Sequence, residues 1–218
     1  MISIIVCTFN DSHFLKKCLP SCFQQNVEKE VILVDDASSA PLDPWVANAI
    51  KTENIKYIRQ EQNKGLATAR NTGIAHSKYD LVIPMDADDY FYPNVLEQML
   101  GAMTDDVDVV YGNVTDSNII HYPIKEQLTK EHFLQNNPLF CSSLFRKKLW
   151  EHTGGYPEQY HVSYEDWYLW CKAFKCGFKF KYIPLTVYEH ANRHDSMLKQ
   201  LHPNRAKYVE IATQPLRD

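Results

Sequence analysis

The sequence of 218 residues has no long apolar run, no block of one charge and no glycine-rich linker. No apolar segment reaches the roughly 18 to 20 residues of a membrane-spanning helix, and the start "MISIIVCTFN" lacks the features of a signal peptide. The formal net charge of −4 is spread along the chain, which argues against a nucleic-acid surface or a polybasic membrane patch. We therefore expect a cytoplasmic protein with no nucleic-acid partner and no transmembrane segment.

Closely spaced cysteine pairs are also missing. None of the six cysteines stands in a C-x-x-C pair, and a chain with 44% hydrophobic residues has enough apolar material for a core without disulfides. The sequence therefore predicts free, buried thiols. Cys18 and Cys22 lie one helical turn apart and fit the apolar stripe of a helix over residues 12–25, which Pro20 should kink or break.

Apolar strands alternate with helix-like segments along the first half of the chain. Strands are predicted at 2–7, 31–36, 55–59, 80–86 and 107–112, and helices at 12–25, 44–52, 65–77 and 93–104. This alternation predicts an α/β fold with a mostly parallel central sheet and helices on both faces. With no linker and no internal repeat, we expect a single domain over residues 1–218.

The second half of the chain has a different pattern. Residues 113–162 show little strand periodicity, and a helix at 164–176 closed by Gly177 is predicted after them. Two short apolar segments, "FKFKYI" and "TVYEH", follow that helix. We interpret residues 1–112 as a nucleotide-binding half and residues 113–218 as an acceptor-binding half.

Three carboxylates follow the apolar strand at 80–86. In the stretch "VIPMDADDYF", Asp86 and Asp88 are two residues apart and point to the same side of an extended chain, and Asp89 comes next. Carboxylates held close together repel each other unless a cation or hydrogen-bond donors occupy the gap. Their oxygens suit Mg²⁺ or Mn²⁺, which keep open positions for phosphates. A solvated turn is the alternative.

Two further polar clusters are expected at the same edge of the sheet. Asp35 and Asp36 end the second strand, where a carboxylate can bind a base or a ribose, with an Asx turn as the alternative that these two residues alone favour. In "NKGLATARNTGI", Gly65 allows a close approach of the backbone and the helix N-terminus favours anions. Arg70 follows on that helix as a phosphate or carboxylate partner or as a surface charge.

Five motifs occur together in a characteristic order: "SIIVCTFND", "VILVDDASS", "NKGLATARNTGI", "VIPMDADDYF" and "YEDWYLW". From about residue 2 to residue 196 the chain thereby resembles the family 2 glycosyltransferases, inverting enzymes of the GT-A fold. The resemblance implies transfer of a sugar from a nucleotide diphosphate donor, here expected to be a UDP-sugar, to an acceptor hydroxyl with Mn²⁺ or Mg²⁺. It also implies that residues 1–112 bind the nucleotide sugar.

The resemblance assigns roles residue by residue. It implies nucleotide contacts from Thr8, Asn10, Asp36, Lys64, Gly65, Arg70 and Asp86, and metal contacts from Asp88 with support from Asp89. The pair Glu165 and Asp166 opens the predicted helix, whose N-terminal partial positive charge keeps a carboxylate ionised. The resemblance makes Asp166 the base that takes the acceptor proton, and an ordinary acidic helix start is the alternative.

Aromatic and basic residues surround the predicted catalytic helix. Tyr164 and Trp167 are candidates for the acceptor site, and Trp170 with Phe174 is expected in the core. In "YEHANRHDSM", we assign His190 to the metal and Arg193 and His194 to the diphosphate, with plain surface residues as the alternative. The chain departs from the family pattern at Tyr168, where an acidic residue is common, and at Tyr188-Glu189, where Tyr-Arg is common.

Other nucleotide-binding classes lack support. A dehydrogenase or a nucleotidyltransferase would carry a glycine-rich loop after the first strand, and "CTFNDSH" contains no glycine. The remaining alternative is a catalytically silent module that binds a sugar nucleotide or a glycan. We expect a role in bacterial-type surface polysaccharide or glycoconjugate synthesis, with a glycan, lipid-linked or other hydroxyl acceptor. The sequence allows a homo-oligomer or a peripheral partner at the inner face of the membrane.

Overall fold

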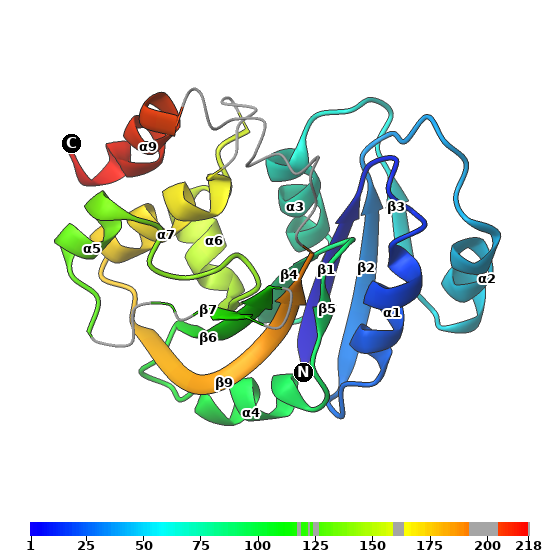
Figure 1. Ribbon diagram of the computed structural model, residues 1–218, viewed down its shortest axis with the longest axis horizontal. Helices are drawn as coiled ribbons and strands as arrows, with labels where there is room; N and C mark the ends of the chain where they lie inside the picture. The colour runs from blue at the N-terminus through cyan, green and yellow to red at the C-terminus, as the bar shows by residue number, and fades with distance from the viewer. Residues whose placement is uncertain (117–118, 122, 124–126, 159–163, 192–204, 218) are drawn as a thin grey trace.

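One sheet connects the two halves of the chain in the computed structural model, which describes residues 1–116, 119–121, 123, 127–158, 164–191 and 205–217 (Figure 1). The strands follow the order β3-β2-β1-β4-β8-β6-β9-β5, with β7 paired to β6. The predicted α/β class is therefore confirmed. The division into a nucleotide half and an acceptor half stays a prediction.

The first half supplies the parallel part of the sheet. It consists of β1 (Ile2–Thr8), β2 (Lys29–Asp35), β3 (Lys56–Arg59) and β4 (Leu81–Asp86). β1 pairs in parallel with β2 and β4, and β2 pairs in parallel with β3. The carboxyl ends of these strands therefore meet at one edge, as the sequence predicts.

The second half adds antiparallel pairs, so that the sheet as a whole is mixed. Its strands are β5 (Tyr90–Phe91), β6 (Val109–Asp116), β7 (Ile119–His121), β8 (Leu144–Arg146) and β9 (Phe180–His190). β8 lies antiparallel between β4 and β6, and β9 runs parallel to β6 and antiparallel to β5.

Strand β9 is continuous and curved, where the sequence predicts two separate segments (Figure 1). Pro184 lies at a register shift in its pairing with β6, at a place where a strand tolerates a missing N–H. Gly112 lies opposite this shift, and a Cβ there would approach Leu185 O to 2.5 Å. Proline and glycine thus mark an irregularity in one strand, which sequence patterns cannot distinguish from a strand break.

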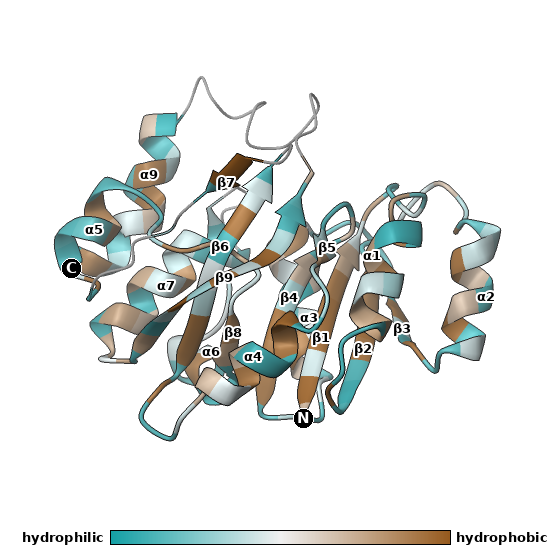
Figure 2. Cartoon of the chain, turned by 60° about the horizontal axis from the view of Figure 1, so that its bottom comes forward, coloured by the Kyte–Doolittle hydropathy of each residue, from teal (hydrophilic) through white to brown (hydrophobic). Residues whose placement is uncertain are grey.

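Helices cover both faces of the sheet, as predicted. On one face lie α1 (Leu15–Phe23), α2 (Pro44–Thr52) and α4 (Val95–Ala102). On the other lie α3 (Leu66–Ala75), α5 (Lys130–Gln135), α6 (Lys147–Thr153), α7 (Glu165–Lys175), α9 (Arg205–Thr213) and the 3₁₀ turn Gln214–Leu216. The central strands β1 and β4 are buried along most of their length, as expected for strands that are covered on both faces (Figure 2).

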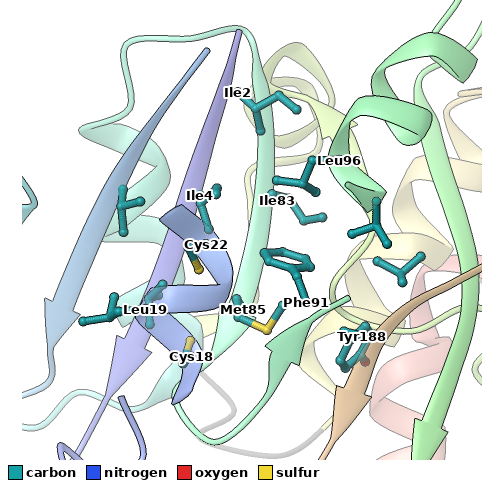
Figure 3. Packing of buried hydrophobic residues seen from close by; sticks show 14 of the residues in the cluster. Ile2, Ile4, Cys18, Leu19, Cys22, Ile83, Met85, Phe91, Leu96 and Tyr188 are labelled. Atoms are coloured by element: carbon teal, nitrogen blue, oxygen red, sulfur yellow. The ribbon is translucent and has the colours of Figure 1, made fainter. Parts of the chain in front are cut away.

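The first face shows how α1 packs. Cys18 and Cys22 lie in one apolar cluster with Ile4 and Met85 (Figure 3). The helix runs through Pro20, so the predicted break at this residue is wrong. In a helix of nine residues the proline removes one hydrogen bond, while the buried apolar stripe stays intact.

All cysteines are free, but Cys141 is half-buried and Cys176 is exposed, which corrects the expectation of uniform burial.

Short elements fill the region that the sequence leaves without periodicity. Residues 113–162 contain the end of β6, β7, α5, β8 and α6, none of which exceeds seven residues apart from β6. Such lengths are too short for a periodic pattern to emerge.

Within the described part of the chain, no helix is long and apolar enough to cross a membrane.

Candidate active site

Polar residues gather where β1, β2 and β4 end. In the register of the sheet, Thr8 pairs with Asp35, and Cys7 pairs with Asp86. Asp36 extends β2 by one hydrogen bond, since its N–H donates to Thr8 O at 2.9 Å. The strand ends therefore place the predicted nucleotide residues side by side.

The loop after β1 is held by Asn10. This residue has φ of 59°, and its Oδ1 accepts from Ser39 N at 2.8 Å and from Ala40 N at 3.2 Å. Its own N–H donates to Ser38 Oγ at 2.8 Å. Asn10 thus joins the two loops at the strand ends. Thr8 Oγ1 is buried and has no hydrogen-bond partner within the described residues.

Asp36 shapes the start of α3. Its Oδ1 accepts from Lys64 N at 2.9 Å, and its Oδ2 accepts from Gly65 N at 2.8 Å. Gly65 has φ of 87°, a conformation that glycine adopts without strain. The structure thus brings Asp36, Lys64 and Gly65 together through backbone amides, with the Lys64 side chain exposed. Nucleotide contacts by these residues stay a prediction.

Asp35, which precedes Asp36 in the chain, has a structural role. It is fully buried and accepts from Ser38 N at 2.8 Å and Tyr57 Oη at 2.9 Å, and it pairs with Arg59. Burial alone would raise the pKa of Asp35, but the hydrogen bonds from Ser38 and Tyr57 and the charge of Arg59 outweigh it and lower the pKa. Asp35 therefore stays ionised and holds β3 to β2.

Arg70 connects the donor edge of the sheet to the predicted catalytic helix. Its Nη2 donates to Asp86 Oδ1 at 2.7 Å, and its Nη1 donates to Glu165 Oε1. The side chain is buried, with 1% of the residue exposed. Of the expectations for Arg70, the carboxylate partner is confirmed and the surface charge is wrong, and burial of the side chain argues against the predicted direct contact with a nucleotide.

The acidic cluster after β4 forms a tight turn. Asp89 N donates to Asp86 O at 3.1 Å, and Asp89 Oδ1 accepts from Ala191 N at 2.9 Å. Asp86 and Asp88 are half-buried, whereas Asp89 is buried. Burial, together with the charges of Asp86 and Asp88, raises the pKa of Asp89 well above its usual range.

These carboxylates fit a divalent cation. Asp89 Oδ2 is buried and has no partner among the described residues, and a nearby cation would offset the repulsion that raises its pKa. The described part of the chain contains no group of three or more His, Cys, Asp or Glu residues arranged to hold a metal ion alone. A cation at Asp88 and Asp89 would therefore need further ligands, such as donor phosphates. His190 precedes the residue that binds Asp89 and stays a predicted ligand.

The acidic pair opens α7. Glu165 is buried, and burial outweighs the lowering effect of Arg70, which raises the pKa of Glu165 to about 7. Asp166 is half-buried, and its Oδ2 accepts from Asn137 Nδ2 at 2.8 Å. Burial also raises the pKa of Asp166, against the effects of Arg70 and its hydrogen bonds. A carboxylate with a raised pKa and partial exposure has the properties of a general base.

Of the two predicted acceptor residues, Trp167 and Tyr164, only Tyr164 is partly exposed. Trp167 is 1% exposed and its indole N–H donates to Phe133 O at 2.8 Å, so the expectation that it contacts the acceptor is wrong. Tyr164 is half-buried at the N-terminus of α7 and stays a prediction. Trp170 is fully buried, and Phe174 packs against the same cluster, as predicted. Arg193 and His194 lie outside the described residues.

Three site residues were missed by the sequence reasoning. Asn137 contacts Asp166, and Cys141 Sγ lies 3.9 Å from Asp86 Oδ2. Asn71 accepts from Trp150 Nε1 at 2.7 Å and from Tyr156 N at 2.9 Å, and thereby fixes the turn that follows α6. Asn71 lies in the motif "NKGLATARNTGI" next to Arg70, but the sequence assigns it no role, and no pattern marks the other two residues.

Solved structures identify the fold as GT-A. Residues 1–349 of S. aureus TarS in complex with UDP-GlcNAc match with a TM-score of 0.75 and 21% identity, over 90% of this chain and 60% of that chain. The mannosyltransferase PcManGT of Pyrobaculum calidifontis, in complex with GDP-Man and Mn²⁺, matches with a TM-score of 0.78 and 19% identity, over 100% of this chain and 64% of that chain.

Sequence comparison identifies the family. The family model "Glycosyl transferase family 2" matches residues 3–159, and the chain belongs to this family. It is 25% identical over 191 residues to WfgD of Escherichia coli, a UDP-Glc:alpha-D-GlcNAc-diphosphoundecaprenol beta-1,3-glucosyltransferase, covering 82% of this chain and 74% of WfgD. The chain spans 42% of the length of another relative, from Bacillus subtilis, and less than two thirds of the two solved structures.

Proposed function

We propose that the protein is an inverting glycosyltransferase that moves a sugar from a nucleotide diphosphate sugar to an acceptor hydroxyl. The observation that carries the proposal is the buried Arg70, whose guanidinium joins Asp86 of the acidic cluster to Glu165 beside Asp166. The guanidinium of Arg70 thereby fixes the position of Asp86 on the donor side relative to the acidic pair that contains the candidate base. Family membership supports the same reaction class.

A UDP-sugar is the donor we favour. WfgD is named for UDP-glucose and TarS is seen with UDP-GlcNAc, whereas PcManGT is seen with GDP-mannose, so the family fold accepts more than one base. In this chain, the unpartnered Thr8 Oγ1 and the loop that Asn10 braces lie at the ends of β1 and β2. We infer that they contact the nucleoside together with Asp36, and that Asp86 lies at the ribose.

We infer that Mn²⁺ or Mg²⁺ binds with the donor at Asp88 and Asp89. A divalent cation there supplies positive charge that neutralises the leaving diphosphate. Asp89 keeps one buried oxygen without a partner among the described residues, which supports this assignment. His190, beside the residue that binds Asp89, is a further candidate ligand.

Asp166 is the proposed base. Its carboxylate removes the proton of the acceptor hydroxyl as the oxygen attacks the anomeric carbon. The new glycosidic bond forms as the bond to the nucleoside diphosphate breaks, and one displacement inverts the anomeric configuration. Glu165 contributes indirectly by binding Arg70. We place the reaction in surface polysaccharide or glycoconjugate synthesis, since WfgD uses a lipid-linked saccharide acceptor.

Calorimetric titration of UDP into the purified protein, with and without Mn²⁺, tests the donor site. We expect binding that requires the metal, followed by slow release of UDP from UDP-glucose or UDP-N-acetylglucosamine in water. Binding without turnover, in the presence of a range of glycan acceptors, would favour the silent sugar-nucleotide-binding module instead. Absence of UDP binding under both conditions would contradict the UDP assignment.

A further inference from the structure

Asn137 contacts the carboxylate of Asp166 from the segment that follows α5. Its Nδ2 donates to Asp166 Oδ2 at 2.8 Å. The other carboxylate oxygen, Oδ1, accepts from the backbone N–H of Trp167 at 2.8 Å. Each oxygen of the proposed base therefore has a donor of its own, and the two donors together fix the plane of the carboxylate.

The position of Asn137 is itself fixed by packing. Trp167 Nε1 donates to Phe133 O at 2.8 Å, which ties α5 to α7 directly beside the base. The ring of Phe133 packs on Phe174 with centroids 4.8 Å apart, and Leu139 just beyond Asn137 is buried. Asn137 therefore follows a helix that cannot move away from α7 without breaking buried contacts.

The amide of Asn137 is oriented by what it faces. An ionised carboxylate only accepts hydrogen bonds, so Nδ2 must point at Asp166. This orientation leaves Asn137 Oδ1 buried without a partner among the described residues, a condition that destabilises a folded protein. A small apolar residue would avoid this cost but would give no donor to Asp166. Asn137 therefore donates to Asp166 at a cost to the stability of its own segment.

We infer that Asn137 is a positioning residue for Asp166, which orients the base and stabilises its ionised form. The inference rests on the proposed function, in which Asp166 accepts the proton of the acceptor. It adds a residue from a segment without any family motif to the catalytic apparatus.

Several other groups set the charge state of Asp166. The groups that face it are Arg70 from α3, Asp86 at the end of β4, Cys141 before β8, Tyr156 after α6, and Glu165 and Cys171 on α7 itself. Burial raises the pKa of Asp166, and Arg70, the Trp167 amide and Asn137 lower it. Loss of the Asn137 donor therefore raises this pKa further, and the base becomes protonated over a wider range of pH.

The kinetic test measures UDP release from UDP-glucose and UDP-N-acetylglucosamine with Mn²⁺, with water as acceptor, at pH 5.5 to 9. We compare Asn137→Ala and the isosteric Asn137→Asp with Asn136→Ala, an exposed neighbour that serves as control. A hydrogen bond to a charged group corresponds to a loss of about tenfold to a hundredfold in rate. We expect that loss at the acidic end, recovery toward high pH, and unchanged UDP affinity. Rates that fall equally at every pH would overturn the inference.

A second measurement does not depend on activity. In protein labelled with ¹³C at aspartate carboxyls, the Asp166 resonance is assigned by its absence in Asp166→Asn. Its titration midpoint should move to higher pH in Asn137→Ala and further in Asn137→Asp, where a second carboxylate faces it. An unmoved midpoint would refute a role for Asn137 at the base. If the wild type releases no UDP either in water or with a range of glycan acceptors while this midpoint moves, the proposed function fails and the contact of Asn137 with Asp166 stands.

Discussion

Asp166 and Asp88 have different parts in the proposed reaction, so single substitutions separate transfer from binding. Asp166→Asn keeps the size of the side chain but removes the base, and general-base catalysis contributes about 10² to 10⁴ in rate. We expect kcat for UDP release to fall by about a hundredfold or more, with UDP affinity within about twofold of wild type. Steady-state kinetics and calorimetry measure the two quantities. Transfer at the normal rate would show that another group is the base.

Asp88→Asn tests the metal. An amide is a weaker ligand than a carboxylate for Mn²⁺, so the metal-dependent part of UDP binding should be lost. We expect UDP affinity in Mn²⁺ to fall by about tenfold or more, and to match the affinity of the wild type measured in EDTA. Asp105→Asn, at an exposed position between α4 and β6, serves as the control. Equal metal dependence in Asp88→Asn and wild type would exclude Asp88 as a ligand.

The sequence located the motifs but not their contacts. It placed Arg70 on a helix, yet the partners of its guanidinium lie 16 and 95 residues away, a relation that only the fold creates. The sequence does not reveal that Trp167 is buried, because an aromatic residue next to an acidic pair occurs both in protein cores and in sugar-binding sites. Asn137 gave no signal, since one amide in an irregular segment has no pattern to stand out from.

At the scale of elements, α3 packs so closely on the sheet that it requires a glycine. A Cβ at Gly73 would lie 2.2 Å from Ile5 Cγ2, whereas a Cβ at Gly101 in α4 meets nothing within 4 Å. Gly73→Ala should destabilise the protein by about 1 to 3 kcal/mol through overpacking, and Gly101→Ala should stabilise it by about 0.5 to 1 kcal/mol. Urea unfolding of both variants measures the difference. Equal effects would mean that β1 moves to accommodate the methyl group.

The same contrast explains which elements the sequence predicted. The parallel strands β1 to β4 are separated by helices of nine or ten residues, so the alternation of strand and helix repeats over a long stretch of sequence. β8 has three residues and takes its place between β4 and β6 only through tertiary pairing. Short strands of this kind are specified by their neighbours in space, which a single sequence does not show.

At the scale of the whole molecule, the candidate site makes folding depend on proton binding. Burial raises the pKa of Asp89, Glu165 and Asp166, for Glu165 from 4.5 to about 7. Between the ordinary values and the raised ones, the folded chain binds more protons at these groups than the unfolded chain does. Their contribution to stability therefore falls as pH rises through this window. Asp35 acts oppositely at lower pH, because its lowered pKa stabilises the fold above its ordinary value of 3.8.

Glu165→Gln isolates one part of this dependence. The amide keeps the shape of the side chain and does not titrate, so the decline in free energy of unfolding between pH 5 and pH 8 should become shallower than in wild type. Urea unfolding at unit pH steps measures the slope, with the exposed Glu151→Gln on α6 as a matched control. Parallel curves for wild type and Glu165→Gln would show that Glu165 is already ionised at pH 5, in which case Arg70 dominates over burial. A shallower curve would show that the protein accepts a stability cost at neutral pH to keep a charged pair beside its proposed base.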